Sequence, residues 1–450
     1  MLNKLKQLNL PKYDCDFIDI RIEQTRNVNI MYYQKELYWF QDETKLGAFI
    51  RVYKDKMWYY VATTDVENLE SELKKLLSNA GVTERKENIV AQTEKETILK
   101  TIADDYVFHW TKEAKIEVIN KMRDIVENDP LVLSVYTGWT DIITDKYYIN
   151  TKGISYYYDK AVSGMRVGYD LKDGDDLFQT GFYKAFQKKE DMGDMESELR
   201  DHFAEGKLFI KAPTIEPGKY PVVLSPHATG IFAHESFGHK SEADWMIGDE
   251  TMKAEWVIGK KVANEKVSIV DVGDDPKTSG YCPIDDEGNI SEKTYLIKNG
   301  ILTGRLHNEA TAKLLEEAVT GNARAINFEY EPIVRMTNTY FEAGELSFDE
   351  LIKPIKKGYF IKKLSHGSGM STFTLAAEKA YLIENGKLSH PVKINIATGT
   401  VFQTLHDIDG LTDKIEIDSF VGGGCGKMDQ QGLPVAFGGP YIRVKEMSLS

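Results

Sequence analysis

The chain has 450 residues, of which 42% are hydrophobic and 28% charged, so it is long enough for two or three domains with buried cores. Its formal net charge is -14 and its basic residues never form a long block, which argues against direct binding of nucleic acid. The three cysteines form no disulfide framework, the N-terminus lacks the apolar core of a signal peptide, and no stretch approaches the ~20 apolar residues of a membrane span, so we expect a cytosolic protein without a membrane segment.

The first elements along the chain are predicted strands. From Asp16 to about Tyr60 the pattern is that of strands, with "DFIDIRIEQ", "VNIMYYQKELYWF", "GAFIRVYKD" and "KMWYYVAT" rich in β-branched and aromatic residues. A helix is predicted in the following stretch, "DVENLESELKKLLSNAG", with Asp65 as its cap and Gly81 at its end.

A similar order follows once more. A helix is predicted over residues 111–127, where apolar residues repeat at spacings of three and four. Residues 131–173 again have the pattern of strands, and the polar helix "DMGDMESELRDHFAEG" follows them. We interpret the repeated strands-then-helix unit as a weak internal duplication within one α+β domain covering residues 1–206.

The second half is predicted to be β-rich. Residues 211–220, "KAPTIEPGKY", are the best linker, and we place a second domain at residues 207–450. Two predicted hairpins, "TYLIKNGILTG" and "AYLIENGKLSH", carry Asn-Gly turns between apolar strands. A helix in "FDELIKPIKKGYF" interrupts these strands. The predicted fold class is therefore α+β, with a β-rich second domain that begins with a chemistry-bearing helix.

That helix contains "AHESFGH", residues 233–239. Ser225 and Pro226 are a good N-cap and first residue for it. In a regular α-helix, five residues turn the chain by about 500°, which leaves His234 and His239 about 140° apart. A π-bulge, or a break at Gly238, would bring the two histidines to the same side.

Two histidines with an adjacent glutamate are typical of sites that activate water on zinc. His234 and His239 would bind the ion, and Glu235 would take a proton from the water and later pass it to the leaving amine. A chance match to the pattern remains an alternative, and a third ligand has to come from elsewhere.

Cys425 is a candidate for the third ligand. It lies in "VGGGCGKMDQQGLPVAFGGP", where glycines permit close backbone approach. A buried structural cysteine is the commoner role of a lone thiol, whereas a thiolate would complete a His/His/Cys zinc site. Both interpretations remain open from the residues alone.

Other polar residues have weaker patterns. His227 is expected to be solvated at the helix start, and His366 lies in "LSHGSGMS", which we interpret as a flexible loop that could border a cleft. Glu242 and Asp244 either orient the histidines as hydrogen-bond acceptors or are surface charges.

One further acidic stretch, "YCPIDDEGN", contains Cys282, Asp285, Asp286 and Glu287. Its spacing lacks the alternating oxygen ligands of an EF-hand calcium loop, so a charged turn is the favoured interpretation.

Several motifs in order resemble the TldD/PmbA family, also known as modulators of DNA gyrase, and in particular its metal-bearing TldD branch. The matching stretches between residue 225 and the C-terminus are "HESFGHKSEAD", "IDDEGN", "LIKNGILTG", "TGNARA", "RMTNTY", "KKGYF", "AYLIENGKLSHPVK" and "GGGCGK". The N-terminal part agrees only in pattern. Departures occur at residues 236–237, 240–241 and in "SHGSGMS", which affects the expected cleft shape and substrate preference but not the ligands.

This resemblance implies a zinc metallopeptidase with His234, His239 and Cys425 as ligands and Glu235 as catalytic base. It also implies a two-domain protomer, a homodimer or a heterodimer with a PmbA-like subunit, and an unfolded or extended peptide as substrate. The PmbA branch lacks the zinc motif that this chain retains.

Two functional hypotheses follow. The first is a zinc-dependent peptidase whose substrate strand adds to a sheet edge of the second domain. The alternative is a non-catalytic peptide-binding subunit in which a metal only holds the three side chains together. Direct action on gyrase or DNA would need a localised basic surface on a chain of charge -14.

Overall fold

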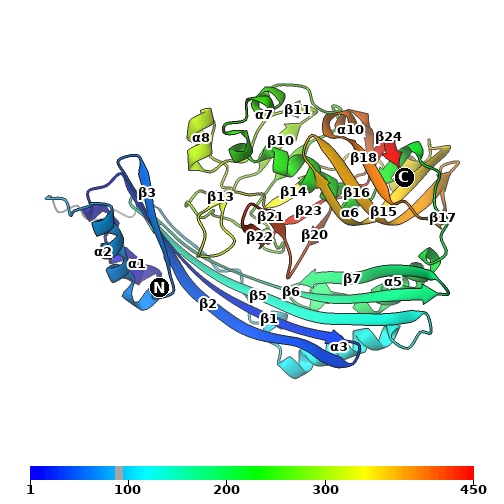
Figure 1. Ribbon diagram of the computed structural model, residues 1–450, viewed down its shortest axis with the longest axis horizontal. Coiled ribbons are helices and arrows are strands. Elements are labelled where there is room, and N and C mark those ends of the chain that lie inside the picture. The colour runs from blue at the N-terminus through cyan, green and yellow to red at the C-terminus, as the bar shows by residue number, and fades with distance from the viewer. Residues whose placement is uncertain (87–94) are drawn as a thin grey trace.

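The computed structural model describes residues 1–86 and 95–450. A long, curved sheet forms the N-terminal part of the molecule (Figure 1). Its strand order is β3-β2-β1-β5-β6-β4, with β7 beside β6, and only the pairing of β4 with β6 is parallel. The strands are β1 (Phe17–Tyr33), β2 (Glu36–Lys54), β3 (Met57–Thr63), β4 (Lys95–Leu99), β5 (Val132–Asn150), β6 (Ile154–Asp173) and β7 (Asp176–Phe186).

The alternation of apolar and charged side chains along β1 explains why this sheet has two different faces. Ile18, Ile20 and Ile22 of β1 are fully buried in an apolar cluster with α2 (Leu69–Asn79). Because successive side chains of a strand point to opposite faces, the charged residues between them point the other way. The first sheet therefore has one apolar face and one face rich in charge.

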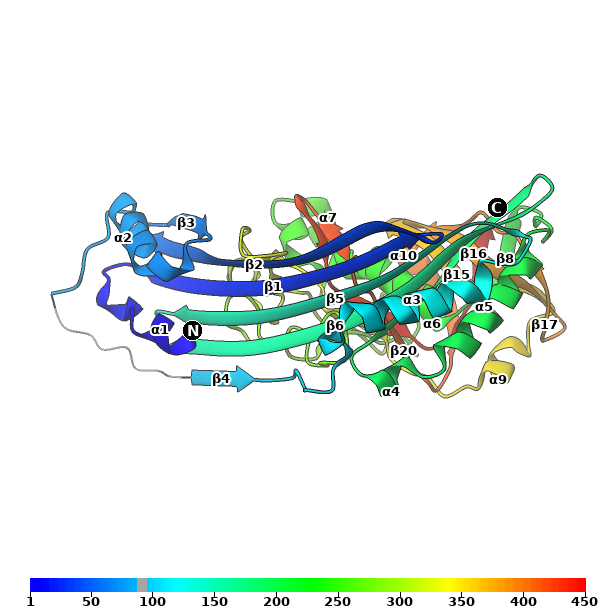
Figure 2. The ribbon, with the colours of Figure 1, turned by 90° about the horizontal axis from the view of Figure 1, so that it is seen from below.

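Helices cover the apolar face (Figure 2). They are α1 (Leu2–Lys6), α2, α3 (Lys112–Val126), α4 (Lys189–Met192) and α5 (Met195–Phe209). The helices predicted from periodicity are confirmed. Asp65 precedes a 3₁₀ turn over Val66–Asn68 that leads into α2, but its carboxylate accepts hydrogen bonds from the Asn68 side chain and caps no backbone N–H. None of the described helices has the length and apolar character needed to cross a membrane.

The predicted repeat agrees with this topology. Strands β1-β2-β3 are followed by α2, and strands β5-β6-β7 are followed by α5. The two triplets meet through the antiparallel pairing of β1 with β5.

The C-terminal part contains two larger sheets. One has the order β15-β8-β24-β18-β16-β17, and an extra pairing of β15 with β16 closes it on itself. The other has the order β11-β10-β9-β14-β23-β20. Their strands are β8 (Gly218–Leu224), β9 (Ile269–Asp271), β10 (Thr294–Lys298), β11 (Ile301–Leu302), β14 (Asn338–Phe341), β15 (Lys357–Gly369), β16 (Thr372–Glu384), β17 (Lys387–Val392), β18 (Ile396–Thr400), β19 (Ile408–Leu411), β20 (Glu416–Ser419), β23 (Ala436–Gly439) and β24 (Ile442–Leu449).

Short elements complete this part. Two small hairpins pair β12 (Ala323–Arg324) with β13 (Ile333–Val334), and β21 (Cys425–Lys427) with β22 (Gln430–Leu433). The helices are α6 (Pro226–Ile231), α7 (Glu250–Glu255), α8 (Glu309–Leu315), α9 (Phe348–Ile352) and α10 (Val401–Asp407). The α+β fold class with a β-rich second half is thus confirmed, while a domain boundary at residue 206 remains a prediction.

Turn chemistry in this part follows the sequence closely. Asn299 and Gly300, and likewise Asn385 and Gly386, all have positive φ, between 49° and 78°, as a type I′ hairpin turn requires. Both predicted hairpins are confirmed, one in each sheet. The helix predicted over residues 348–360 is shorter, since it ends at Ile352 before Pro354, and Gly358 to Phe360 belong to β15.

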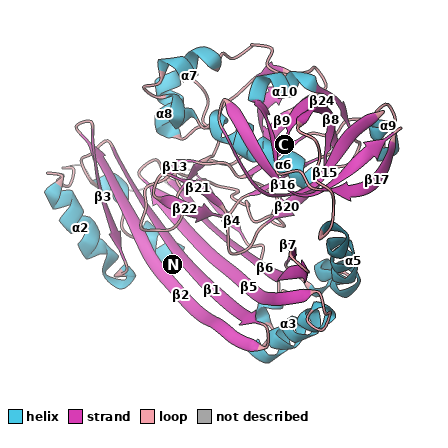
Figure 3. Cartoon of the chain, turned by 45° about the vertical axis from the view of Figure 1, so that its right-hand side comes forward, coloured by secondary structure: helices cyan, strands magenta, loops and turns pink. Residues whose placement is uncertain are grey.

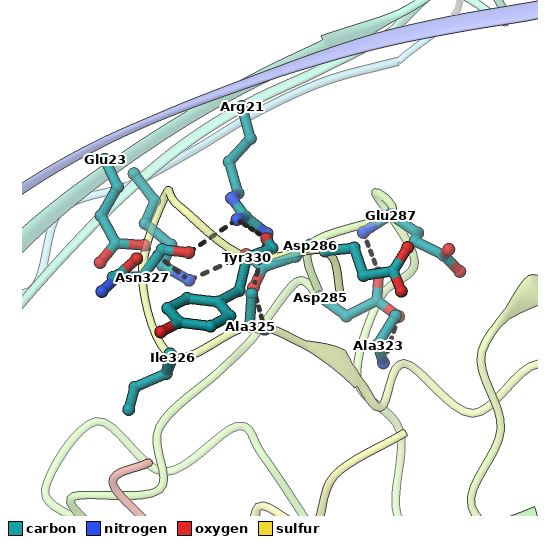
Figure 4. A network of polar contacts seen from close by, with 12 residues as sticks. Arg21, Glu23, Asp285, Asp286, Glu287, Ala323, Ala325, Ile326, Asn327 and Tyr330 are labelled. Atoms are coloured by element: carbon teal, nitrogen blue, oxygen red, sulfur yellow. Dashed lines mark hydrogen bonds and ion pairs between the residues drawn. The ribbon is translucent and has the colours of Figure 1, made fainter. Parts of the chain in front are cut away.

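The C-terminal part lies over the charged face of the first sheet (Figures 1 and 3). Residues 285–287 meet this face, where Asp286 pairs with Arg21 (Figure 4). Asp286 also pairs with Lys146, and Glu287 pairs with Arg51. The predicted turn is present, but its three carboxylates are 0%, 2% and 8% exposed rather than solvated. Basic side chains of the first sheet provide counter-charges for Asp286 and Glu287, whereas Asp285 accepts hydrogen bonds from the backbone N–H groups of Glu287, Asn289 and Ala323.

Candidate metal centre

The helix that carries "AHESFGH" changes its hydrogen-bonding type along its length. It begins where predicted, because the Ser225 hydroxyl accepts the N–H of Ala228 and Pro226 occupies the first turn. The α-helical part, α6, ends at Ile231 and is followed by a π-helix over Phe232–Gly238. A 3₁₀ turn over His239–Ser241 closes the segment.

The π-helix brings the two histidines together. The ring centroids of His234 and His239 are 5.0 Å apart, with an interplanar angle of 75°. The predicted π-bulge is therefore confirmed, because its wider turn removes the opposed orientation of an α-helix. Gly238 has helical dihedral angles, and a Cβ atom there would overlap Sδ of the buried Met336. Glycine is needed here for space rather than for a special backbone conformation.

Cys425 reaches this helix from a distant hairpin. It is the first residue of β21 and is 5% exposed. Its Sγ lies 3.3 Å from Nε2 of His239. One ligand atom each from His234, His239 and Cys425 lies within 4.8 Å of the others. Three potential metal donors thus converge although the sulfur lies 186 residues beyond the second histidine.

The same contacts change the charge state of the thiol. Burial raises the pKa of Cys425, but the hydrogen bonds and charges of the two imidazoles outweigh it and lower the pKa to about 5. Burial lowers the pKa of His239, while Cys425 and Glu242 raise it to about 10. A thiolate beside imidazole nitrogens is therefore the stable form at neutral pH, and thiolate is the form that binds metals.

Glu242 fixes the orientation of the His239 ring. Its Oε2 lies 3.2 Å from Nδ1 of His239 and also accepts from Nε1 of Trp245 at 3.1 Å. Glu242 is fully buried; burial raises its pKa, but His239 and Lys427 lower it to about 2. With Nδ1 held by this carboxylate, Nε2 is turned towards Cys425. The orienting role expected for Glu242 agrees with these contacts, and the surface-charge alternative is wrong.

Asp244 acts on the other side of this network. Its carboxylate accepts from Nζ of Lys427 at 2.6 Å, and the same ammonium group lies 3.0 Å from Glu242. Lys427 is a residue of this site that the motifs did not predict. Side chains two residues apart on a strand share a face. The position of Lys427 two residues after Cys425 was therefore the feature of the sequence that could have placed it in the site.

A buried arginine holds the hairpin in place. Nη2 of Arg335 donates to the backbone carbonyl of Cys425 at 2.6 Å, and Nη1 donates to the carbonyl of Gln430 at 3.2 Å. Gly424 is equally required, because a Cβ atom there would overlap the carbonyl oxygen of Leu433. The position of the sulfur is thus set by contacts of the hairpin backbone.

Glu235 lies at the border between the π-helix and the end of β15. It is half-buried, and a Cβ atom at Gly367 would be 3.3 Å from its Cγ. His366, the neighbour of Gly367, is exposed and paired with Ala376 of β16. The flexible loop expected around His366 is therefore a strand, because the β15–β16 hairpin extends to Gly369.

His227 also differs from its prediction. Instead of being solvated, its side chain is 22% exposed, with Nδ1 2.7 Å from Asp418 and Nε2 3.3 Å from the carbonyl of Leu364. Strands β15 and β20 pack against α6 and provide both partners. His227 therefore connects the start of the helix to two strands and is not one of the three converging donors.

An unpaired ring nitrogen gives independent support for a metal ion at these three donors. Nδ1 of His234 is buried and has no hydrogen-bond partner among the described residues, which is costly for a ring nitrogen. Two ligands of a tetrahedral zinc ion lie about 3.5 Å apart, close to the sulfur–nitrogen distance seen here. Two imidazoles and one thiolate leave a fourth position open, as in catalytic zinc sites.

Comparison with protein families gives two matches. Residues 217–450 match the family model described as the PmbA/TldA metallopeptidase C-terminal domain, and residues 18–81 match the PmbA/TldA metallopeptidase domain 1. The first match contains all the residues of the candidate metal centre.

Individual proteins are similar over nearly the whole chain. A protein named metalloprotease from Synechocystis is 30% identical, covering 96% of this chain and 94% of its own. One named zinc metalloprotease TldD homolog from Saccharolobus solfataricus is 29% identical, covering 97% and 96%. The solved structure of TldE from Thermococcus kodakarensis has a TM-score of 0.77 at 15% identity, covering 99% and 98%, which supports the fold alone.

Proposed function

Because the chain belongs to the PmbA/TldD family of metallopeptidases, we propose that it is a zinc-dependent peptidase in which His234, His239 and Cys425 bind the ion and Glu235 is the catalytic base. The resemblance drawn from the motifs is thereby confirmed. The proposal for the site depends on one observation, the convergence of these three donors within 4.8 Å.

Held by His234, His239 and Cys425, a zinc ion would act as a Lewis acid that lowers the pKa of water and polarises a peptide carbonyl. Glu235 accepts the proton of the attacking water and returns it to the leaving amine. Glu242 keeps the His239 ring in the orientation and tautomer that leave Nε2 free as a ligand.

The substrate proposed is an unfolded or extended peptide that adds as a strand to β15. This strand pairs with β8 only from Tyr359 to Ile361, and beyond that it pairs with β16 on one side. Its other edge runs past Glu235 at Gly367. Main-chain hydrogen bonds to this edge would hold a peptide with little sequence preference.

We further propose a cytosolic dimer, formed with an identical chain or a PmbA-like one. The tip of the β1–β2 hairpin exposes large apolar side chains, among them Tyr38 at 77%, Trp39 at 50% and Phe40 at 41%. An apolar surface of this kind is typical of a protein interface. With a net charge of -14, no direct nucleic-acid partner is proposed.

The test is turnover of an unfolded peptide by the zinc-loaded protein. Glu235→Ala should abolish cleavage, with a loss of at least about 100-fold because general base catalysis contributes this much, while zinc content stays unchanged. Chelation should abolish cleavage by the unsubstituted chain, and added zinc should restore it. Glu265→Ala, which removes an exposed carboxylate of the same half, is the control. If zinc-loaded protein binds peptides without cleaving them, the non-catalytic alternative is correct.

A further inference from the structure

A cavity of about 220 Å³ lies between the charged face of the first sheet and the C-terminal part. Thr144, Lys146 and Lys160 line it from β5 and β6, and Arg324 and Leu433 line it from the opposite side. Figure 4 shows the neighbouring ion pair of Arg21 with Asp286, beside the cavity residues Glu23 and Asn327. None of the three proposed metal ligands lines this cavity.

Its charged lining is predominantly basic. Four basic residues (Lys45, Lys146, Lys160, Arg324) and one acidic residue (Glu23) line it, which gives +4 - 1 = +3. Lys146 has its own partners, since its ammonium lies 2.8 Å from Asp286 and 3.3 Å from Glu23. The remaining cations therefore outnumber the carboxylates of the wall, in a protein whose net charge is -14.

Among the described residues, two of these cations have carbonyl groups as their only hydrogen-bond partners. Nζ of Lys160 donates to the carbonyl of Tyr281 at 3.2 Å. Arg324 is 3% exposed and donates to the carbonyls of Met336 and Pro434. In the part of the chain that the structure describes, no carboxylate lies within ion-pair distance of either group.

These cations also repel one another. Burial and the charges of Arg324 and Lys146 together lower the pKa of Lys160 to about 8. A negative group between them would replace repulsion by attraction, and cations buried without a counter-charge are costly otherwise.

The rest of the lining determines what kind of anion fits. Ile142, Phe328 and Leu433 contribute apolar surface to the same cavity. The exposed Lys45 and Gly432 lie on its rim, so it is accessible from solvent. A mainly apolar wall with a few convergent cations suits a small organic molecule with one anionic group.

We propose that this cavity binds a small organic carboxylate, with its anionic group between Lys160 and Arg324. Such a carboxylate is either a free organic anion or the C-terminus of a peptide. Leu433, which lines the cavity, pairs with Cys425 across the β21–β22 hairpin, so an occupant touches the element that carries the proposed thiolate ligand. The cavity is a binding site whether or not the chain cleaves peptides.

Binding is tested by calorimetry on the full chain with four probes. These are butyrate, butyramide, an acetylated dipeptide with a free C-terminus, and the same dipeptide as its amide. Both carboxylates are expected to bind more tightly than their amides, and the tighter of the two identifies the source. Equal affinity for acid and amide in both pairs overturns the proposal.

Substitutions separate the cavity from other anion sites. Lys160→Met and Lys160→Gln are each expected to weaken carboxylate binding about tenfold or more, because they remove a charged hydrogen bond. Lys172→Met, which removes an exposed lysine of the same strand, should leave binding unchanged. A variant that stays folded by circular dichroism and binds the carboxylate as before contradicts the site.

The titrations are repeated after chelation. Binding in the cavity is expected to persist without zinc, whereas a carboxylate that coordinates zinc would be lost. Failure of carboxylate binding and failure of peptide cleavage are thus observed separately.

Discussion

His239 is held from both sides of its ring, by Glu242 at Nδ1 and by the sulfur of Cys425 at Nε2. The carboxylate is in turn bound by the buried ammonium of Lys427, two residues beyond the cysteine. Each group therefore stabilises the ionised form of the next, which offsets the cost of burying charge. At this scale the candidate metal centre is a connected set of hydrogen-bonded polar groups between one helix and one hairpin.

Replacing the thiol tests whether it is a ligand. Cys425→Ser should lower zinc affinity by roughly 100-fold or more, because even the loss of an outer hydrogen-bond partner costs a metal site about 10- to 100-fold. Elemental analysis of the purified variant beside the unsubstituted chain is the measurement. Cys15→Ser removes a half-buried thiol outside the site and should retain zinc. Equal zinc in both variants would exclude Cys425 as a ligand.

The element that determines the site is the π-helix at Phe232–Gly238. A regular α-helix is the more stable conformation for most sequences, so this wider turn needs support from its surroundings. Buried packing of Phe232 and Phe237 in the main core of the C-terminal part provides it on one side. On another side, Gly238 supports the turn because its lack of a side chain leaves room for Met336 to pack against it.

Adding a methyl group at Gly238 should disturb this packing. Gly238→Ala is expected to lower the free energy of unfolding by about 1–3 kcal/mol, as extra carbon in a filled core usually does. Zinc affinity should fall as well, because the same turn positions both histidines. Thermal unfolding and zinc titration measure the two effects. The double variant Gly238→Ala, Met336→Ala makes room for the methyl group, and unchanged zinc affinity in the single variant would contradict this account.

At the scale of the whole molecule, charged contacts connect the first sheet and its helices to the C-terminal part. Glu205 of α5 accepts from Lys362 and Tyr381 at 2.5 Å each and from Lys379 at 3.0 Å. Burial raises the pKa of Glu205, and these three partners outweigh it and lower the pKa to about 2. The interface of the two halves is thus stabilised by ionised carboxylates, here and at Asp286, where burial raises the pKa but Arg21 and Lys146 hold it well below its usual range.

This shift predicts how stability changes with pH. A carboxyl group whose folded pKa lies below its unfolded value of about 4.5 stabilises the fold above that value and loses the contribution as the pH falls towards 2. Glu205→Gln should therefore lower stability by on the order of 2 kcal/mol at pH 7. The deficit should shrink as the pH is lowered through 4.5 towards 2.

Calorimetric unfolding of both chains between pH 7 and pH 3 checks this. Glu446→Gln, which removes an exposed carboxylate paired with Lys219, should cost less than about 0.5 kcal/mol. A deficit for Glu205→Gln that does not change with pH would show that the charge of this carboxylate is not the cause.

Local patterns in the sequence were sufficient for many elements. Enrichment in β-branched and aromatic residues predicted the long strands, periodicity predicted α3, and Asn-Gly predicted both hairpins. The spacing of His234 and His239 also predicted a distorted helix, because two histidines five residues apart cannot face one ion in a regular one. Each of these is a local property, since a dihedral preference or a repeat of apolar side chains is encoded by neighbours in the chain.

Only the tertiary structure decided which residues far apart in the sequence contact one another. Nothing near Cys425 specifies that its hairpin meets the π-helix, or that Lys427 meets Glu242. In the same way, residues 285–287 have the local pattern of a charged turn, and the opposing basic face of the first sheet supplies the cations that make the burial of Asp286 and Glu287 possible. The physical reason is that a local pattern specifies which face of an element is apolar or charged, while the element that covers this face depends on how the whole chain packs.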